Sequence, residues 1–336
     1  MKAAVIEQPG LENLKIKDLP VPEPGPGEVL VRLRAAALNY RDRLTVEGGY
    51  GSRQRHENLI PLGDGAGEVT ALGPGASRFE VGDRVTLSFF PDWTGGPPTE
   101  ARFETSLGGR IDGTAAEYRA LPEHALVPTP DYLSDIEAAA LPCAGVTAWS
   151  AVISQGGIGP GDVVVVQGTG GVALFALQFA KMAGAEVIQT SSSDLKLARV
   201  TELGADHGIN YAAEPEWGVK ARELNRGRGV DHVVELGGAA TLKQSFRAIR
   251  VGGTISMIGV LGGPRVELLV PLVVTRNIRL QGVTVGSREQ LETMMRAMAL
   301  HRIRPVVDRV FPLDELAQGL DYLASGQHFG KVAIEI

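Results

Sequence analysis

The feature that most constrains this chain is a strand-like run that ends in a glycine-rich turn. Residues 163–166 are four consecutive valines, an apolar run typical of a strand buried on both faces. Gly168, Thr169, Gly170 and Gly171 follow after one residue. Apolar residues then recur at helical spacing over residues 172–183, which predicts a helix. The chain therefore passes from a buried strand through a tight turn directly into a helix.

Strand and helix patterns continue to alternate after this turn. Further strands are expected at residues 186–190, 208–211, 231–235, 254–258 and 278–283, and helices at 195–203, 219–224 and 242–249. This alternation is typical of a doubly wound parallel sheet with helices on both faces. Residues 1–124 show short apolar runs between Gly and Pro turns, which predicts a β-rich domain. The expected fold class is α/β.

Two other segments have patterns of their own. Residues 91–113 are polar, contain Gly and Pro and show no period, so we expect an excursion or flap. After residue 288 we expect a helix, an extended segment, a helix at 316–323 and a final strand at 331–336. That last strand is expected to return to the first domain.

The glycine turn has the layout that a dinucleotide requires. Gly168 allows a sharp turn, Gly170 lets the backbone approach a pyrophosphate, and the small Ala173 allows helix and strand to pack closely. The first turn of the helix, with Gly171 and Val172, offers unpaired N–H groups and a positive dipole end to phosphates. The alternative is a tight strand-to-helix turn without a ligand. The strand before it and the helix after it favour dinucleotide binding.

The end of the second strand bears on which nicotinamide binds. An enzyme that uses NAD usually has an acid there, but this chain has Ser191 and Ser192, with Lys196 in the next helix. Hydroxyls and an ammonium group can hold a 2′-phosphate that a carboxylate would repel. Asp194 competes for this role, but we expect it to cap the helix. NADP(H) is therefore the expected cofactor. The alternative for Lys196 is that it is simply a solvated residue of the helix.

Charge and composition exclude several classes of protein. A formal net charge of −6 argues against a nucleic-acid-binding surface. No apolar stretch reaches the roughly 20 residues that span a bilayer, and the opening residues are too few for a signal peptide. Cys143 is the one cysteine, which excludes an intramolecular disulfide and suits a reducing compartment. We expect a cytoplasmic protein without membrane or nucleic-acid partners.

Motifs spread along nearly the whole chain resemble one family. They include Asn39-Tyr40-Arg41-Asp42, Gly63-Asp64-Gly65-Ala66-Gly67, Gly145-Val146-Thr147-Ala148-Trp149 and Gly330-Lys331-Val332. Together with the glycine turn, they resemble the medium-chain dehydrogenase/reductase superfamily, and especially its zinc-independent, quinone-oxidoreductase-like branch. The resemblance implies a GroES-like catalytic domain over residues 1–144 and 287–336. It also implies a Rossmann NADP(H)-binding domain over residues 145–286, with the cofactor between the two domains.

Zinc-dependent relatives hold a catalytic metal with three side chains. By resemblance the three positions here are Asn39, Gly63 (with Asp64 beside it) and Cys143, so a single thiol remains. Tetrahedral zinc requires three protein ligands and an open position. The 91–113 segment has no cysteine for a structural zinc, and the six histidines, His56 among them, show no ligand spacing. No metal is expected.

The resemblance also assigns roles to residues along the cofactor. Thr147 is expected near the carboxamide of the nicotinamide, Tyr211 near the adenine or its phosphate, and Lys331 at the pyrophosphate. Other residues are expected to line the cofactor at strand ends: Leu236, Ile258, Val260, Val283 and Val285. Plain core packing is the alternative for the apolar ones, and plain packing for Tyr211.

The expected reaction is hydride transfer from NADPH to a quinone, an enone or an aldehyde or ketone. Asn39, Tyr40 and Tyr50 resemble cleft residues of the family and are the candidates to hydrogen-bond the substrate oxygen. Tyr40 or solvent would deliver the proton, unless Tyr40 only packs structurally. Two other functions stay open: a zinc-type alcohol dehydrogenase with atypical ligands, and a non-catalytic NADPH-binding protein. By resemblance, a homodimer is expected through the edge strand near residues 278–285.

Overall fold

The computed structural model describes residues 1–55 and 57–336, and the chain divides into two compact units. Residues 1–146 and 285–336 form the split unit, and residues 147–284 form the central unit. From the sequence, we expect the domain boundaries after residues 144 and 286, within two residues of the boundaries between these units.

The central unit is built on one parallel sheet of six strands. Its strands are β8 (Val163–Gln167), β9 (Glu186–Ser191), β10 (His207–Asn210), β11 (Val230–Glu235), β12 (Ile249–Met257) and β13 (Arg279–Gly282). Their spatial order is β10-β9-β8-β11-β12-β13, and every neighbouring pair is parallel. The chain therefore winds outward from β8 in one direction and then from β11 in the other. This is the strand order of a doubly wound dinucleotide-binding sheet.

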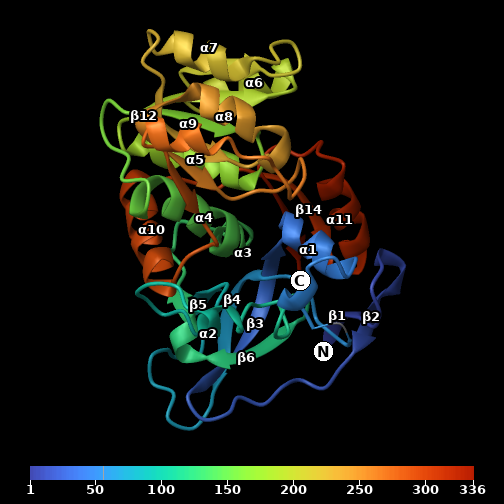
Figure 1. Cartoon of the computed structure of the whole chain (residues 1–336). Coiled ribbons are helices and arrows are strands. Elements are labelled where there is room, and N and C mark those ends of the chain that lie inside the picture. The colour runs from blue at the N-terminus through green and yellow to red at the C-terminus, as the bar shows by residue number, and fades with distance from the viewer. Residues whose placement is uncertain (56) are drawn as a thin grey trace. The chain divides into compact units, whose positions relative to one another are not determined.

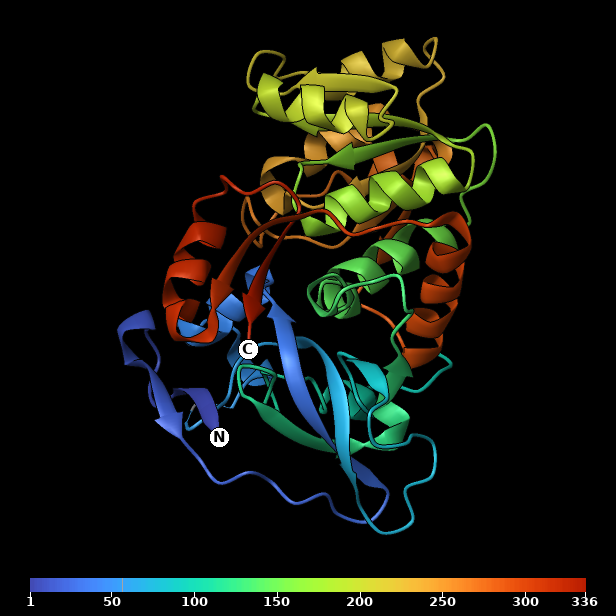
Figure 2. The ribbon, with the colours of Figure 1, turned by 180° about the vertical axis from the view of Figure 1, so that it is seen from behind.

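Helices cover both faces of this sheet. The central unit contains α5 (Gly171–Met182), α6 (Asp194–Glu202), α7 (Trp217–Leu224), α8 (Leu242–Ala248) and α9 (Val270–Thr275), with short turns η5 (Ser150–Ser154) and η6 (Gly238–Ala240). Figure 1 shows α8 on the near side of the sheet, and Figure 2, the view from behind, shows α5 on the other side. Val163, Val165 and Ile255 pack against Trp217 and Phe246 on the α7 and α8 side. The all-apolar strands thus have a buried face on each side.

The split unit contains a sheet of seven strands in the order β14-β15-β3-β4-β5-β7, with β6 paired to β3. Its strands, including the separate hairpin β1–β2, are β1 (Lys2–Ile6), β2 (Leu14–Asp18), β3 (Glu28–Ala37), β4 (Asp64–Leu72), β5 (Arg84–Leu87), β6 (Tyr118–Pro122), β7 (Leu126–Pro128), β14 (Val307–Pro312) and β15 (Lys331–Glu335). All pairs are antiparallel except β14–β15. The final strand pairs with β3, so the two ends of the chain share one sheet.

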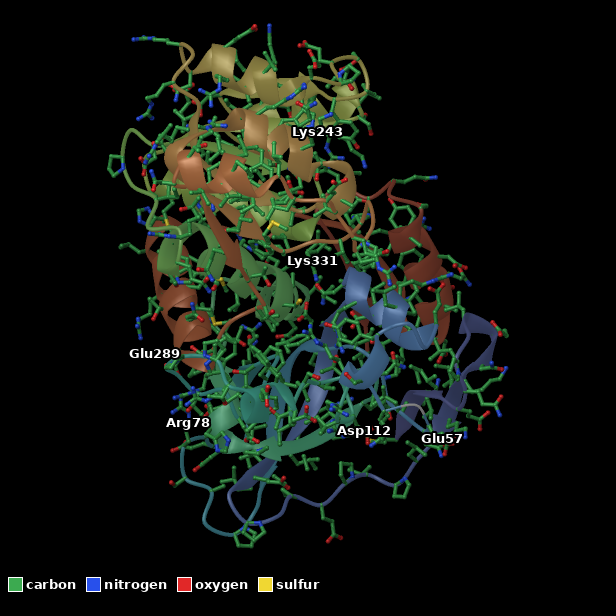
Figure 3. All side chains as sticks on the ribbon, in the orientation of Figure 1. Glu57, Arg78, Asp112, Lys243, Glu289 and Lys331 are labelled. Atoms are coloured by element: carbon green, nitrogen blue, oxygen red, sulfur yellow. The ribbon has the colours of Figure 1, made fainter. Side chains whose placement is uncertain are left out.

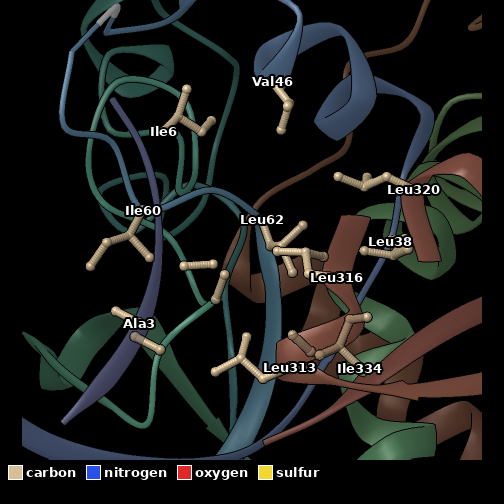
Figure 4. Close-up of a cluster of buried hydrophobic side chains, with 14 of the residues drawn as sticks. Ala3, Ile6, Leu38, Val46, Ile60, Leu62, Leu313, Leu316, Leu320 and Ile334 are labelled. Carbon is tan, nitrogen blue, oxygen red and sulfur yellow. The ribbon is translucent and has the colours of Figure 1, made fainter. Parts of the chain in front are cut away.

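Helices and helical turns complete the split unit. They are η1 (Leu11–Asn13), α1 (Tyr40–Val46), η2 (Gly51–Arg53), α2 (Glu100–Phe103), η3 (Glu123–Ala125), α3 (Asp135–Ala139), the π-helical turn η4 (Leu141–Gly145), α10 (Arg288–His301), η7 (Leu313–Glu315) and α11 (Leu316–Ala324); α4 (Val146–Trp149) crosses the boundary. One core cluster joins the beginning of the chain to its end: Ala3 and Ile6 belong to it together with Leu316, Leu320 and Ile334 (Figure 4). Burial of these side chains attaches the last fifty residues to the first domain.

The segment from residue 91 to 113 is more ordered than its aperiodic sequence indicates. It contains α2, and its Trp93 and Phe103 rings pack with centroids 5.6 Å apart. Phe90 packs against both rings, at 6.0 and 5.2 Å. The backbone carbonyl of Trp93 also accepts a hydrogen bond of 2.9 Å from Arg288 N at the start of α10. Aromatic packing, which follows no helical or strand period, organises this segment.

Candidate functional site

The expected dinucleotide-binding residues of the central unit follow the carboxyl ends of its strands. Leu236, Ile258 and Val283 come directly after β11, β12 and β13, Tyr211 comes after β10, and Ser191 ends β9. Because the strands are parallel, these positions share one edge of the sheet. The winding reverses between β8 and β11, and open sheets of this kind bind ligands at such a reversal.

The glycine turn lies at that reversal. Gly168 has a φ of +74°, a left-handed conformation that favours glycine, and no heavy atom lies within 4 Å of where its Cβ would be. Gly170 precedes the 12-residue helix α5 and provides no side-chain cap for its first N–H groups. Thr169 and Ala173 are buried. The turn therefore presents open backbone space and uncapped N–H donors, as a pyrophosphate requires.

The end of β9 presents hydroxyl groups. Ser191 is buried and its Oγ accepts a 3.2 Å hydrogen bond from Ser193 N, while Ser192 is exposed. Ser193, rather than Asp194, caps α6: its Oγ accepts from Lys196 N at 3.4 Å. Our expectation for Asp194 was wrong because this carboxylate instead accepts a 2.7 Å hydrogen bond from Asn210 Nδ2. An acid therefore stands three residues beyond Ser191.

The remaining cofactor candidates differ in their surroundings. Thr147 is buried in α4, while Tyr211 and Val260 are exposed. Val283 is buried, and its N–H donates to Met257 O at 3.0 Å. Val285 has a φ of 52°, a strained conformation for a β-branched residue, and it belongs to the split unit.

A buried carboxylate that sequence reasoning missed organises the loop after β11. Oε1 of Glu235 accepts from Gly237 N and Gly238 N, both at 2.9 Å, and from the Thr241 hydroxyl. Oε2 accepts from Gln167 Nε2 at 2.7 Å and from the Ser245 hydroxyl. This network joins β8 to β11 at the point where the winding reverses. The acid at the end of the run Val233-Val234-Glu235 was the available signal.

In the split unit, Asn39 lies in a buried polar cluster with Asp64 and Lys331. Asn39 Nδ2 donates to Asp64 Oδ2 at 2.8 Å, and Asn39 Oδ1 accepts from Lys331 Nζ at 2.8 Å. Lys331 Nζ lies 3.1 Å from Asp64 Oδ2. Residues from α1, β4 and β15 therefore meet at one point, and the ion pair at its centre is withdrawn from solvent.

Lys331, which we expect at the pyrophosphate, has its ammonium group hydrogen-bonded within the split unit. Its side chain is 3% exposed (the residue is labelled in Figure 3). Its ammonium group donates to Asn39 Oδ1, Asp64 Oδ2 and, at 2.8 Å, to Leu38 O. A lysine ammonium has three N–H donors, and all three have acceptors within the split unit. The expected contact of Lys331 with a pyrophosphate stays a prediction.

Cys143 adjoins the same cluster through its backbone. Its N–H donates to Asp64 Oδ1 at 2.8 Å, and it belongs to the π-helical turn η4. Desolvation and the nearby Asp64 carboxylate raise the pKa of the Cys143 thiol. A raised pKa disfavours the thiolate, which is the nucleophilic form of cysteine.

Tyr40 and Tyr50, the other catalytic candidates, lie at the two ends of the α1 region. Tyr40 is 44% exposed. Tyr50 is half-buried, and the Arg41 guanidinium carbon lies 4.8 Å from its ring centroid and 5.0 Å from that of Phe89. Arg41 is thus held between two aromatic rings. Tyr40 is the more exposed of the two tyrosines.

Asp42 is the second buried carboxyl of this region. Burial raises its pKa to about 6, against the opposing effect of the Arg41 guanidinium. Its Oδ2 accepts from Asn39 N at 2.8 Å and so fixes the start of α1, from which the Asn39 side chain projects.

The side chains present do not fit a catalytic zinc ion. A Cβ on Gly63 would lie 2.5 Å from Phe89 Cε2, so the second ligand position has no room for a donor side chain. The Lys331 ammonium already supplies a positive charge beside Asn39 and Asp64. Within residues 1–55 and 57–336, no group of three or more His, Cys, Asp and Glu side chains is arranged to hold a metal; His56 lies outside the described residues.

None of the helices described is both long and apolar enough to cross a membrane.

Comparison with known proteins agrees with this architecture. Residues 25–131 match the alcohol dehydrogenase GroES-like domain, and residues 171–299 match the zinc-binding dehydrogenase family. A zinc-type alcohol dehydrogenase-like protein of Schizosaccharomyces pombe is 42% identical over 97% of this chain and 96% of its own length. The predicted α/β fold with a GroES-like domain is confirmed.

Two solved structures extend the similarity to three dimensions. An alcohol dehydrogenase candidate from Sinorhizobium meliloti 1021 has a TM-score of 0.93 and 43% identity, covering 100% of this chain and 98% of that chain. An NAD-dependent alcohol dehydrogenase has a TM-score of 0.91 and 38% identity, with both chains covered completely. The chain belongs to the medium-chain dehydrogenase/reductase superfamily, as an alcohol dehydrogenase-like oxidoreductase that uses a nicotinamide cofactor.

Proposed function

We propose that this protein is a zinc-independent, NADPH-dependent oxidoreductase that reduces a quinone, an enone or an aldehyde or ketone. The observation that carries the proposal is the Lys331 ammonium group, which is hydrogen-bonded to Asn39 and Asp64, at the positions that the family resemblance assigns to the zinc site. A second cation at this point would be repelled by Lys331, and Gly63 provides no ligand. Carbonyl polarisation then falls to hydrogen-bond donors.

The bound nicotinamide supplies the hydride, and the protein supplies position and hydrogen bonds. Asn39 Nδ2 uses one N–H on Asp64 and retains a second, which we assign to the substrate oxygen. Because Lys331 and Asp64 hold both ends of the Asn39 amide, its orientation is fixed before substrate binds. The exposed Tyr40 hydroxyl, or solvent, is assigned to proton delivery, and Tyr50 is the third candidate in the region.

The preference for NADPH rests on the end of β9. Ser191 and Ser192 present hydroxyls at the position where NAD enzymes usually have a carboxylate that binds the ribose hydroxyls. Lys196 adds a positive charge in the next helix. Asp194 opposes this preference, but its carboxylate is hydrogen-bonded to Asn210. A related NAD-dependent alcohol dehydrogenase makes NADH the alternative to be tested.

The names of two relatives support the proposed substrate class. A quinone oxidoreductase of Coxiella burnetii is 28% identical, and so is an acryloyl-coenzyme A reductase of Sulfurisphaera tokodaii, whose named substrate contains a conjugated double bond. Quinones and conjugated double bonds both accept hydride at an electron-poor carbon.

The decisive experiment measures metal content and NADPH oxidation on the same sample of purified protein. We expect less than stoichiometric zinc, oxidation of NADPH by some member of a panel of quinones, enones and aldehydes, and no loss of rate with a chelator. Stoichiometric zinc whose removal abolishes turnover would identify a zinc-type alcohol dehydrogenase instead. Stabilisation by NADPH without oxidation across the panel would identify a binding protein.

Single substitutions test the assigned residues. Asn39→Ala is expected to lower kcat/KM by roughly 100-fold, the usual effect of losing one preorganised donor. Tyr40→Phe tests proton delivery, and Tyr118→Phe, a half-buried tyrosine of β6, is its control. Unchanged turnover in both Asn39→Ala and Tyr40→Phe would refute the catalytic assignment.

We also propose a homodimer that pairs through β13. This strand is the edge of the central sheet, and exposed apolar side chains precede it, among them Leu261, Leu269 and Val274. A second copy would pair the free strand edge and cover these side chains. Sedimentation velocity of the wild type and of Leu280→Pro, which removes an N–H donor from β13, tests this assembly. The single cysteine supports a cytoplasmic location.

A further inference from the structure

The amino-terminal ends of β11, β12 and β13 are basic, although the whole chain is acidic. The segments that lead into β11, β12 and β13 carry seven arginines: Arg222, Arg226, Arg228, Arg247, Arg250, Arg276 and Arg279. Arg228 and Arg250 form ion pairs with Asp231. Arg222 and Arg276 form no ion pair among the described residues. Positive charge without a counter-ion therefore collects at these strand ends, in a chain of net charge −6.

Three of these arginines line one cavity. It has a volume of about 610 Å³, within the usual range of small-molecule sites, and all its lining residues belong to the central unit. The lining residues are Glu216, Val219, Arg222, Arg247, Val251 and Arg276. Val251 is near the amino end of β12, and Arg276 precedes β13. The cofactor candidates follow the carboxyl ends of the same strands, so the cavity is at the opposite edge of the sheet.

Two of the guanidinium groups converge on one carbonyl oxygen. Arg222 Nη2 donates to Ile249 O at 2.6 Å, and Arg276 Nη2 donates to the same oxygen. Burial, and then the charge of Arg222, lower the pKa of Arg276. Two like charges held this close repel each other, and one carbonyl oxygen does not neutralise them. An anion in the cavity would relieve that repulsion.

The arginines also retain unused donors. Among the described residues, Arg222 makes four hydrogen bonds to carbonyl groups and Arg276 makes two, to Phe246 O and Ile249 O. A guanidinium group has five N–H donors, so three donors of Arg276 have no acceptor in the part of the chain that the structure describes. The one side-chain partner of Arg247 within residues 1–55 and 57–336 is Glu216, whose side chain is 71% exposed. Arg222 and Arg276 cap the carbonyl groups at the end of α8, and this capping leaves N–H donors of Arg276 available to a ligand.

We propose that this cavity is a second ligand site, which binds the phosphate group of a small organic phosphate. Guanidinium groups match phosphate oxygens in geometry and charge. Val219 and Val251 are exposed and form an apolar wall beside the arginines, so the organic part of the ligand would lie against them. The site is independent of the proposed hydride transfer.

The test is a calorimetric titration of the full-length protein with phenyl phosphate. The dinucleotide site is first filled with saturating NADPH or NADH, whichever binds more tightly, so that the glycine turn is occupied. Val251→Glu adds a negative charge to the cavity wall without removing any hydrogen bond of the arginines. Val266→Glu, at an exposed valine of the same unit outside the cavity, is the matched control.

We expect saturable one-to-one binding to the wild type and to Val266→Glu, and at least roughly tenfold weaker binding to Val251→Glu, since about 1.4 kcal/mol of repulsion changes affinity tenfold. Arg276→Gln should weaken binding similarly, while Arg265→Gln, an exposed arginine away from the cavity, should not. Phenyl phosphate should bind more tightly than inorganic phosphate because of the valine wall. Absence of saturable binding to the wild type, or equal binding to Val251→Glu and Val266→Glu, would overturn the proposal.

Discussion

The Nζ atom of Lys331 lies 3.1 Å from the Oδ2 atom of Asp64, and both side chains are almost wholly withdrawn from solvent. The two residues are 267 positions apart in the sequence. Their ion pair fixes Asn39 and attaches β15 to β4 in the split unit.

Asp64→Asn should destabilise the protein strongly, because it leaves the Lys331 ammonium buried without a compensating charge. We expect a loss of about 3 to 5 kcal/mol in the free energy of unfolding, measured with urea. Asp314→Asn, which breaks the exposed Lys2–Asp314 pair, should cost less than about 1 kcal/mol. Equal effects of the two substitutions would contradict the buried pair.

Asp42 should make the protein less stable as pH rises. Its folded pKa of about 6 is above the ordinary value of 3.8, so the neutral form is favoured by the fold. The stability it contributes is complete below the ordinary pKa of 3.8 and is lost as pH rises from there through about 6. Relative to Asp42→Asn, the wild type should lose up to about 3 kcal/mol over that window. Asp18→Asn, at an exposed position, is the control. If the difference in unfolding free energy between the wild type and Asp42→Asn did not change with pH, the raised pKa of Asp42 would be refuted.

His232 should make the protein less stable in acid. It is fully buried in β11, neither ring nitrogen has a hydrogen-bond partner among the described residues, and burial lowers its pKa to about 4. The unfolded chain takes up the proton near pH 6.5, so stability falls as pH drops from 6.5 to 4. The free energy of unfolding, measured with urea at each pH, should therefore fall less in His232→Leu than in the wild type between pH 6.5 and 4, by up to about 3 kcal/mol. His301→Leu, at an exposed histidine, should leave the acid loss in place.

Glu235→Gln should loosen the loop after β11. The glutamine NH₂ group would face donors that now bond to a carboxylate oxygen, at a cost of about 1 to 3 kcal/mol. Hydrogen exchange should quicken at Gly237 and Gly238, whose N–H groups lose an acceptor. Glu223→Gln, at an exposed glutamate of α7, is the control. Unchanged protection of both glycines would show that the network does not hold the loop.

Ser191→Asp should reverse the preference for NADPH. A carboxylate at the end of β9 repels a 2′-phosphate and can accept from ribose hydroxyls, so the Kd for NADPH should rise roughly tenfold or more while that for NADH falls. Lys196→Gln should also weaken NADPH, while Lys243→Gln, on α8 in the same unit (Figure 3), should not. Fluorescence titration of both cofactors measures these changes, and equal Kd values before and after Ser191→Asp would argue against the assignment.

The local pattern of the sequence determined the doubly wound sheet and its glycine turn. Strand and helix periods depend on neighbours two to four residues away, so residues 163–183 carried their own structure in their spacing. The same reasoning failed at Asp194, where the adjacent Ser193 competes for one cap and Asn210, on the next strand, binds the carboxylate.

Only the tertiary structure decided which polar groups meet. Nothing near Lys331 in the sequence indicates Asp64 or Leu38 as its partners, and nothing near Glu235 indicates Gln167. The convergence of Arg222 and Arg276 on Ile249 likewise depends on how two connecting segments pack at one sheet edge. Hydrogen bonds and ion pairs act over a few ångströms, and packing of the whole chain sets those distances. The sequence therefore determined the class of fold and its cofactor turn, while the folded chain alone assembled the charged sites.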